Sequence, residues 1–185
     1  MLEREIKLRF ESAEAARQAL VAIGASPFRP RRLQDDRLLD DAAASLQRRG
    51  CALRLRLDGT DSHLTFKGPV LPGVMKTREE FESVVESGDT LLRILAELGL
   101  TPRFRYQKYR EEFRINGLAS LLVALDETPV GIYVELEGQE ADIEVAAARL
   151  GRAPADYVRA SYRTLFLEFR EAHHVSASDM LFQPL

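Results

Sequence analysis

The sequence predicts an α+β fold in which eight antiparallel strands close into a barrel, with helices packed on the outside. Several segments alternate apolar and polar residues with a period of two, which is typical of strands with two different faces. Amphipathic helical segments lie between or after these strands. Charged residues recur in phase on almost every strand, and eight strands suffice to close a barrel with a small interior.

The first half of the chain is predicted to form a strand, a helix and three further strands. A strand over 2–10 carries Glu3, Glu5 and Lys7 on one face and mainly apolar residues on the other. Ser12 is the expected N-cap of a helix that ends at Gly24. The next strands are predicted over 35–40, 51–58 and 63–67. The basic residues of 29–32 are interpreted as a solvated loop, rather than as a contact with nucleic acid or an outer phosphate.

The second half of the chain is predicted to follow the same order, which amounts to a faint internal repeat. A strand over 76–85 precedes a helix that Asp89 caps and Gly99 ends, and strands follow over 103–115, 122–126 and 131–137. Helices over 139–150 and from Pro154 to about residue 172 complete a domain of residues 1–172. Residues 173–185 are expected to form an irregular or loosely docked C-terminal tail.

Composition narrows the class of protein. Hydrophobic residues make up 45% of the 185 residues and charged residues 30%, which supports a packed core. A net charge of −3 does not favour a nucleic-acid-binding surface, and a single cysteine excludes a disulfide framework. The sequence has no apolar core of a signal peptide and no run of ~20 apolar residues that could span a membrane. We therefore expect a soluble, cytoplasmic protein. A homodimer is compatible with this size, although no segment locates an interface.

The charged strand faces carry like-signed pairs at positions i and i+2. These pairs are Glu3/Glu5, Arg54/Arg56, Glu80/Glu82, Lys108/Arg110 and Glu135/Glu137. One interpretation is an ordinary wet face of an antiparallel sheet. Like charges repel on an open surface, however, and their sorting in phase favours a charged lumen. Burying such groups is costly unless they are paired or bound to a ligand.

A charged lumen would offer two complementary sets of ligand-binding groups. The carboxylates are Glu3, Glu5, Glu80, Glu82, Glu135 and Glu137, and the cations are Lys7, Arg54, Arg56, Lys67, Arg78, Lys108 and Arg110. Clustered carboxylates are hard oxygen ligands suited to Mg²⁺ or Mn²⁺. Arginine and lysine side chains suit phosphate oxygens. The sequence therefore predicts a tunnel that binds a complex of metal and polyphosphate.

The same residues resemble the CYTH family, also called triphosphate tunnel metalloenzymes. The family's ExExK hallmark stands here as Glu3-Arg4-Glu5-Ile6-Lys7, and the supporting motifs follow in order. They are LRLR at 53–56, LTFKGP at 64–69, KTREEFE at 76–82, KYR at 108–110, LDE at 125–127, ELE at 135–137 and SY at 161–162. The resemblance covers residues 1 to about 170 and is closest to the class IV adenylate cyclase and thiamine triphosphatase branch.

The resemblance implies an eight-stranded tunnel and a substrate that carries a triphosphate, such as inorganic triphosphate, thiamine triphosphate or ATP. It implies that Mg²⁺ or Mn²⁺ is held by Glu3, Glu5, Glu135 and Glu137, with Asp126 as a further ligand. Glu3, Glu5 and Lys7 would then be catalytic. Phosphates would be bound by Lys7, Arg54, Arg56, Lys67, Arg78, Lys108 and Arg110, among which Glu80 and Glu82 would orient the cations or aid metal binding.

Two departures from the family pattern bear on the reaction. The second strand reads Asp36-Arg37-Leu38-Leu39-Asp40 and lacks the aromatic residue usual before the last aspartate. The His-Phe pair that often precedes ExExK in cyclases is also absent from this sequence. Hydrolysis of a triphosphate is favoured, because a triphosphate is the minimal ligand that the lumen explains. Class IV adenylate cyclase activity is the alternative, and a non-catalytic polyphosphate-binding module is the second alternative.

Overall fold

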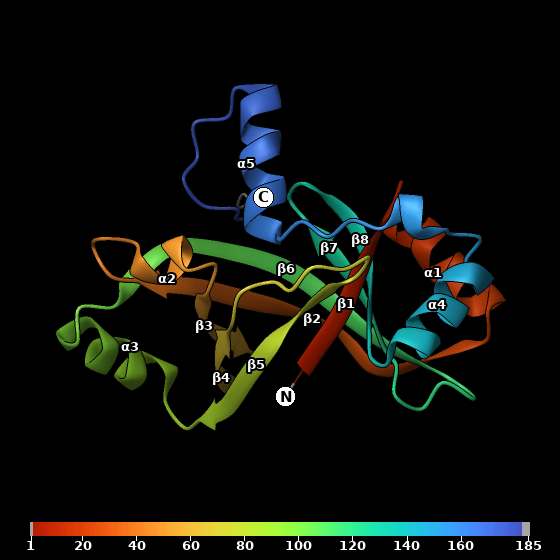
Figure 1. Cartoon of the computed structure of the whole chain (residues 1–185), viewed down its shortest axis with the longest axis horizontal. Coiled ribbons are helices and arrows are strands. Elements are labelled where there is room, and N and C mark those ends of the chain that lie inside the picture. The colour runs from red at the N-terminus through yellow and green to blue at the C-terminus, as the bar shows by residue number, and fades with distance from the viewer. Residues whose placement is uncertain (1, 183–185) are drawn as a thin grey trace.

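The computed structural model describes residues 2–182 and has a closed barrel of eight antiparallel strands (Figure 1). Around the barrel the strands follow the order β1-β5-β4-β3-β2-β6-β7-β8. The strands are β1 (Leu2–Phe10), β2 (Ala25–Asp40), β3 (Ala52–Asp58), β4 (Asp61–Lys67), β5 (Lys76–Val85), β6 (Thr101–Ile115), β7 (Leu122–Thr128) and β8 (Gly131–Glu137). The predicted fold class is therefore confirmed.

β1 closes the barrel because it pairs with β5 on one side and with the last strand, β8, on the other. Glu3 lies opposite Arg78 of β5, and Lys7 lies opposite Glu135 of β8. Each half contributes a strand, a helix of ten residues and three strands, and the first half adds one short helix between two of its strands, so the order of the faint repeat is present in the fold.

The apolar faces of the strands point outward to the helices, which lie outside the barrel (Figure 1). At one end, α1 (Ala13–Ala22) and α4 (Glu140–Arg149) cover a core that contains Ile6 and Val134. At the other end, α3 (Gly88–Glu97) packs Leu95 against Leu55, near the short helix α2 (Ser45–Arg48). Outward apolar faces leave the alternate, charged faces to the lumen.

β2 begins at Ala25, ten residues earlier than predicted, and includes the segment interpreted as a solvated loop. Pro27 and Pro30 interrupt the alternation there, and the register with β6 shifts between Pro27 and Arg29 and between Arg29 and Arg32. Proline cannot donate to a strand ladder, and shifts of register break the period of two. The sequence pattern of this long strand was therefore obscured.

The helix ends follow their capping residues. Ser12 Oγ accepts a 3.1 Å hydrogen bond from Ala15 N–H, which confirms the predicted cap of α1. The cap of α3 is Ser87 instead of Asp89, because Ser87 Oγ accepts from Thr90 N–H. Pro154 starts only a single 3₁₀ turn (Pro154–Asp156), and α5 (Tyr162–His173) begins after its own cap, Ser161.

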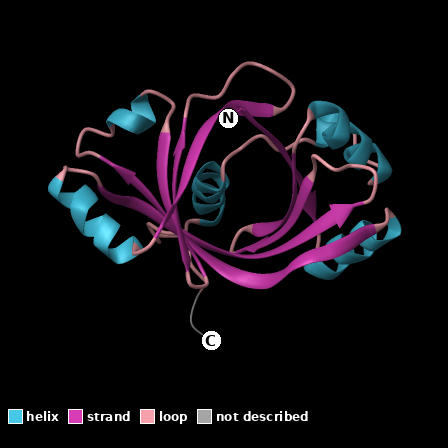
Figure 2. Cartoon of the chain, turned by 90° about the horizontal axis from the view of Figure 1, so that it is seen from below, coloured by secondary structure: helices cyan, strands magenta, loops and turns pink. Residues whose placement is uncertain are grey.

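The C-terminal segment that follows α5 is anchored on the barrel at Met180. Met180 is fully buried, its N–H donates to the carbonyl of Arg105, and its carbonyl accepts from Gln107 N–H at 2.9 Å. This segment is irregular, as expected, but its described part is docked along β6. Figure 2 shows α5 end-on through the ring of strands, with the helix standing over one mouth of the barrel. Within residues 2–182, no helix is long and apolar enough to cross a membrane.

Candidate functional site

The lumen contains a cavity of about 970 Å³ that the charged strand faces line. The predicted site residues on its wall are Glu3, Glu5, Lys7, Arg54, Arg56, Lys67, Arg78, Glu80, Glu82, Lys108, Arg110, Glu135 and Glu137. These groups come from every strand except β2 and β7. The like-signed pairs therefore face inward, and the interpretation as an open, wet sheet face does not describe them.

Asp126 is the predicted site residue that does not line this cavity. Its carboxylate is fully buried behind the wall and accepts from Lys108 Nζ at 2.7 Å, from Arg110 and from the hydroxyl of Tyr162. Burial would raise the pKa of Asp126, but the charges of Arg110 and Lys108 hold it below its usual value. In this arrangement Asp126 fixes two of the lumen cations, and its role as a further metal ligand stays a prediction.

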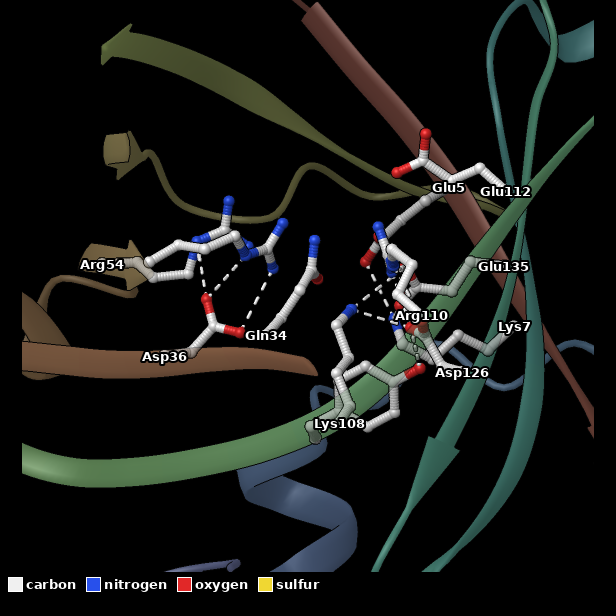
Figure 3. A network of polar contacts seen from close by, with 12 residues as sticks. Glu5, Lys7, Gln34, Asp36, Arg54, Lys108, Arg110, Glu112, Asp126 and Glu135 are labelled. Carbon is white, nitrogen blue, oxygen red and sulfur yellow. Dashed lines mark hydrogen bonds and ion pairs between the residues drawn. The ribbon is translucent and has the colours of Figure 1, made fainter. Parts of the chain in front are cut away.

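Lys108 and Arg110 around Asp126 form a first group of cations, and a second group is held by Asp36 on β2 (Figure 3). Arg56 Nε donates to Asp36 Oδ1 at 2.9 Å, and Arg54 Nε lies 3.5 Å from the same oxygen. Burial would lower the pKa of Arg54, but the charge of Asp36 outweighs it and raises the pKa above its usual value. Sequence reasoning missed the role of Asp36, although it alternates in phase with the inward-facing Gln34.

Glu5 and Glu135 form a third group with the lysines on either side of them. Lys7 Nζ lies 3.0 Å from Glu5 and 3.1 Å from Glu135, and Lys76 Nζ lies 2.5 Å from Glu5. Burial would raise the pKa of Glu5, but the charges of Lys7 and Lys76 outweigh it and lower the pKa far below its usual value. Lys76 was not predicted as a site residue; its position two residues before Arg78 was the available signal.

An excess of negative charge remains where β1 meets β5 and β8. Lys67 Nζ lies 2.9 Å from both carboxylate oxygens of Glu3 and also contacts Glu80. Burial, the hydrogen bond with Glu80 and the charge of Glu5 nevertheless raise the pKa of Glu3 to about 7. Burial and the charges of Glu3 and Glu5 likewise raise the pKa of Glu137 to about 7. A cation would relieve this repulsion.

The chemistry of these carboxylates fits a divalent metal, but their side chains are not arranged as a set of metal ligands. Carboxylate oxygens are the donors that Mg²⁺ and Mn²⁺ prefer. Among the described residues, however, no group of three or more His, Cys, Asp or Glu side chains is placed to hold an ion. Lysines occupy the space between the carboxylates, so metal binding requires some of these ion pairs to open.

A fourth group, which the sequence did not predict, lies in the same cavity. Arg32 Nε donates to Asp58 Oδ1 at 2.7 Å, and Arg32 also reaches Glu112 at 2.5 Å. Gln34 Nε2 donates to the other oxygen of Asp58. Arg31 points elsewhere, because its guanidinium lies over the ring of Tyr109 at 3.6 Å. The basic segment 29–32 is therefore part of a strand that contributes Arg32 to the lumen, which corrects its interpretation as a solvated loop.

Comparison with known sequences agrees with this geometry. A sequence profile of the CYTH domain matches residues 1–162, which is most of the chain. The chain belongs to the CYTH domain family. This CYTH protein is 27% identical over 143 residues to a Methanocaldococcus jannaschii protein that carries the name putative adenylate cyclase. The match covers 77% of this chain and 80% of that relative.

Solved structures share the fold of this CYTH protein at low sequence identity. A Vibrio parahaemolyticus protein described as a putative adenylate cyclase matches with a TM-score of 0.76 and 17% identity, over 90% of this chain and 98% of its own. A Hippeastrum protein described as a putative adenylyl cyclase with a dominant triphosphatase activity matches with a TM-score of 0.62 and 20% identity. The match covers 92% of this chain and 95% of the Hippeastrum chain. One chain of the Schizosaccharomyces pombe Mediator head module also matches, with a TM-score of 0.54 and 11% identity, over 82% of this chain and 92% of its own.

Proposed function

We propose that this CYTH protein is a divalent-metal-dependent triphosphatase that releases orthophosphate from a triphosphate-containing substrate. The observation that carries the proposal is the set of cations in one cavity of the lumen, from Arg54 and Arg56 on one side to Lys108 and Arg110 on the other. Buried cations need anionic partners, and a triphosphate supplies several charged oxygens at once. Asp36 and Asp126 hold these cations in place from behind.

The protein would catalyse hydrolysis mainly by positioning and charge neutralisation. Phosphoryl transfer requires little covalent chemistry from the enzyme. Preorganised cations can stabilise the charge that develops on phosphate oxygens. Arg54, Arg56, Lys108 and Arg110 would bind the phosphates, and Glu3, Glu5, Glu135 and Glu137 would hold Mg²⁺ or Mn²⁺. A bound divalent cation would neutralise phosphate charge and lower the pKa of a water molecule.

The relatives support two reactions on the same kind of substrate. The Hippeastrum protein is described as having a dominant triphosphatase activity, which favours hydrolysis. The Methanocaldococcus jannaschii relative carries the name of an adenylate cyclase, so formation of cyclic AMP and pyrophosphate from ATP is the second candidate. A fold alone does not imply catalysis, and a polyphosphate-binding module is the remaining alternative.

A product assay would decide between these reactions. The purified protein is incubated with inorganic triphosphate, thiamine triphosphate or ATP, with either Mg²⁺ or Mn²⁺, and orthophosphate is separated from pyrophosphate and cyclic AMP. Orthophosphate release is the expected result. Cyclic AMP with pyrophosphate would assign the cyclase reaction instead, and tight binding without any product would favour the binding module.

A double substitution would test the carboxylates in the same assay. Glu3→Gln with Glu5→Gln removes two predicted metal-binding charges while keeping the side-chain volume that packs near Lys67, Lys7 and Lys76. Activity should fall to background, whereas the thermal unfolding transition should remain cooperative. The control is Glu97→Gln with Glu171→Gln, two exposed carboxylates on α3 and α5. Full activity in the Glu3 and Glu5 variant would show that the lumen assignment is wrong.

A further inference from the structure

Gln34 presents a free hydrogen-bond acceptor to the cavity. Only 1% of this residue is exposed, and its side chain lines the lumen. Its Nε2 donates a 2.8 Å hydrogen bond to Asp58 Oδ2, whereas its Oε1 is buried and has no hydrogen-bond partner among residues 2–182. Buried polar atoms are nearly always satisfied, so an unpaired carbonyl in a cavity indicates a missing donor.

The orientation of the Gln34 amide follows from its neighbour. Burial would raise the pKa of Asp58, but hydrogen bonds from Arg32 and Gln34 outweigh it and lower the pKa. Asp58 is therefore an ionised carboxylate, which can only accept hydrogen bonds. Gln34 must turn its NH₂ group toward Asp58, and its carbonyl oxygen is thereby left for another partner.

The missing hydrogen-bond donor to Gln34 Oε1 is not an oxygen of the phosphate chain. In Figure 3 its side chain rises from β2 between the group of Asp36 and Arg54 and the group of Asp126 and Lys108. A triphosphate bound to those cations would pass close to the amide. A phosphate oxygen and a carbonyl oxygen are both acceptors, so they repel each other. A water molecule beside the phosphate chain can donate to the carbonyl.

We propose that Gln34 Oε1 accepts a hydrogen bond from the water that attacks the terminal phosphorus of the bound triphosphate. The inference rests on the proposed triphosphatase function. In the reaction the water oxygen forms a new bond to phosphorus, the bridging P–O bond breaks, and its electron pair leaves with the bridging oxygen. One water proton stays on the orthophosphate product, and the other passes to the leaving oxygen or to solvent. The amide orients the water and exchanges no proton.

Gln34→Met tests this contact, because methionine has a similar length and no strong acceptor. The matched control is Gln107→Met: Gln107 also donates to an aspartate, Asp35, but does not line the cavity. With inorganic triphosphate as substrate, kcat of Gln34→Met should fall roughly 10- to 100-fold, because misplaced reactants lose rate steeply. KM should stay within about twofold, and Gln107→Met should match the unsubstituted protein. An unchanged kcat, or a raised KM alone, would overturn the inference.

Asp58→Asn tests the same contact without removing Gln34. Arg32 would bind the carbonyl oxygen of the new asparagine, whose NH₂ group then faces Gln34 and turns the glutamine amide around. The lumen would lose its free acceptor at nearly constant volume, so kcat should fall as in Gln34→Met. Normal kcat in Asp58→Asn would also overturn the inference. An active unsubstituted protein whose kcat both variants keep would overturn the role of Gln34 alone. A lack of orthophosphate release by the unsubstituted protein would instead overturn the proposed function, and with it the inference.

Discussion

The hydroxyl of Tyr162 donates a 2.7 Å hydrogen bond to Oδ2 of Asp126, which ties the first residue of α5 to the wall of the lumen. The same oxygen accepts from Lys108 at 2.7 Å and from Arg110 at 2.6 Å. The ring of Tyr162 also lies 5.0 Å from Lys108 Nζ and 5.2 Å from Lys7 Nζ. The seating of α5 is therefore coupled to the position of the lumen cations.

Tyr162→Phe should weaken substrate binding more than it destabilises the fold. It removes one hydrogen bond of about 1 kcal/mol but keeps the ring in its aromatic neighbourhood. Asp126 keeps its contacts with Lys108 and Arg110, but the positions of these two cations are less fixed because Asp126 has lost its hydrogen bond to Tyr162. We expect a rise of roughly three- to tenfold in KM for the triphosphate, a range corresponding to about 1 kcal/mol. Steady-state kinetics with urea unfolding would measure both effects.

Tyr157→Phe is the control for this substitution, because Tyr157 follows the 3₁₀ turn and does not line the cavity. It should leave KM unchanged. Equal KM values for the Tyr162→Phe variant and the unsubstituted protein would contradict the coupling between α5 and the cations.

Arg54→Met should reduce affinity for the triphosphate and leave the barrel folded. Arg54 lines the cavity, and Asp36 keeps a partner in Arg56 when Arg54 is replaced. Loss of a charge-assisted hydrogen bond of about 1.5–3 kcal/mol corresponds to an affinity roughly 10- to 100-fold lower. Calorimetric titration with inorganic triphosphate, without added metal, would measure it. Arg93→Met, at an exposed position on α3, controls for the change in net charge. Equal affinities of the Arg54→Met and Arg93→Met variants for triphosphate would contradict the placement of Arg54 in the binding site.

The faces of the strands could be predicted from the sequence because one face is apolar and the other charged. In β1, the alternation of Glu3, Glu5 and Lys7 with apolar residues predicted a charged lumen, and all three side chains line the cavity. Like-signed pairs at positions i and i+2 were the decisive signal. Charges of one sign are tolerated side by side when opposite charges face them across a closed barrel.

The partners of these charges on adjacent strands could not be predicted from the same pattern. Alternation assigns a residue to a face, but it does not say that Lys76 meets Glu5 or that Asp36 holds Arg54 and Arg56. These contacts depend on which strands are neighbours and on their register, which places Lys76 opposite Glu5 and Arg56 opposite Asp36. Gln34 was missed for a different reason: a neutral amide contributes nothing to a charge pattern, and prolines obscured the start of its strand.

Gly138→Ala should destabilise the protein, because the backbone passes very close at this position. A Cβ atom on Gly138 would lie 2.6 Å from the carbonyl oxygen of Ser120, and the Gly138 N–H donates to the carbonyl of Arg4. Backbone shifts forced by such overpacking cost about 1–3 kcal/mol. Because Gly138 directly follows Glu137, we also expect lower activity. Urea unfolding would measure the loss of stability.

Gly73→Ala is the matched control for Gly138→Ala. A Cβ atom on Gly73 would lie 3.6 Å from the carbonyl oxygen of Met75, which is an ordinary van der Waals contact. This variant should unfold at the same urea concentration as the unsubstituted protein. Equal stability of the two alanine variants would contradict the close approach at Gly138.

Asp35→Asn should make the stability of the protein less dependent on acidic pH. Asp35 lies outside the cavity wall and accepts hydrogen bonds from Arg105 at 2.9 Å and Gln107 at 3.0 Å. Burial would raise the pKa of Asp35, but these hydrogen bonds outweigh it and lower the pKa from its usual 3.8. A lowered pKa in the folded state means that this carboxylate stabilises the protein above about pH 4 and loses that contribution as the pH falls through the lowered value.

The asparagine variant has no such carboxylate, so its free energy of unfolding should lie below that of the unsubstituted protein at pH 7. The difference should shrink as the pH is lowered from about 4 toward 2, because protonation removes the advantage from the unsubstituted protein alone. Urea unfolding at several pH values would measure it, with Asp61→Asn at an exposed position of β4 as control. A difference that stays constant across this range would mean that the hydrogen bonds of Asp35 do not favour its ionised form.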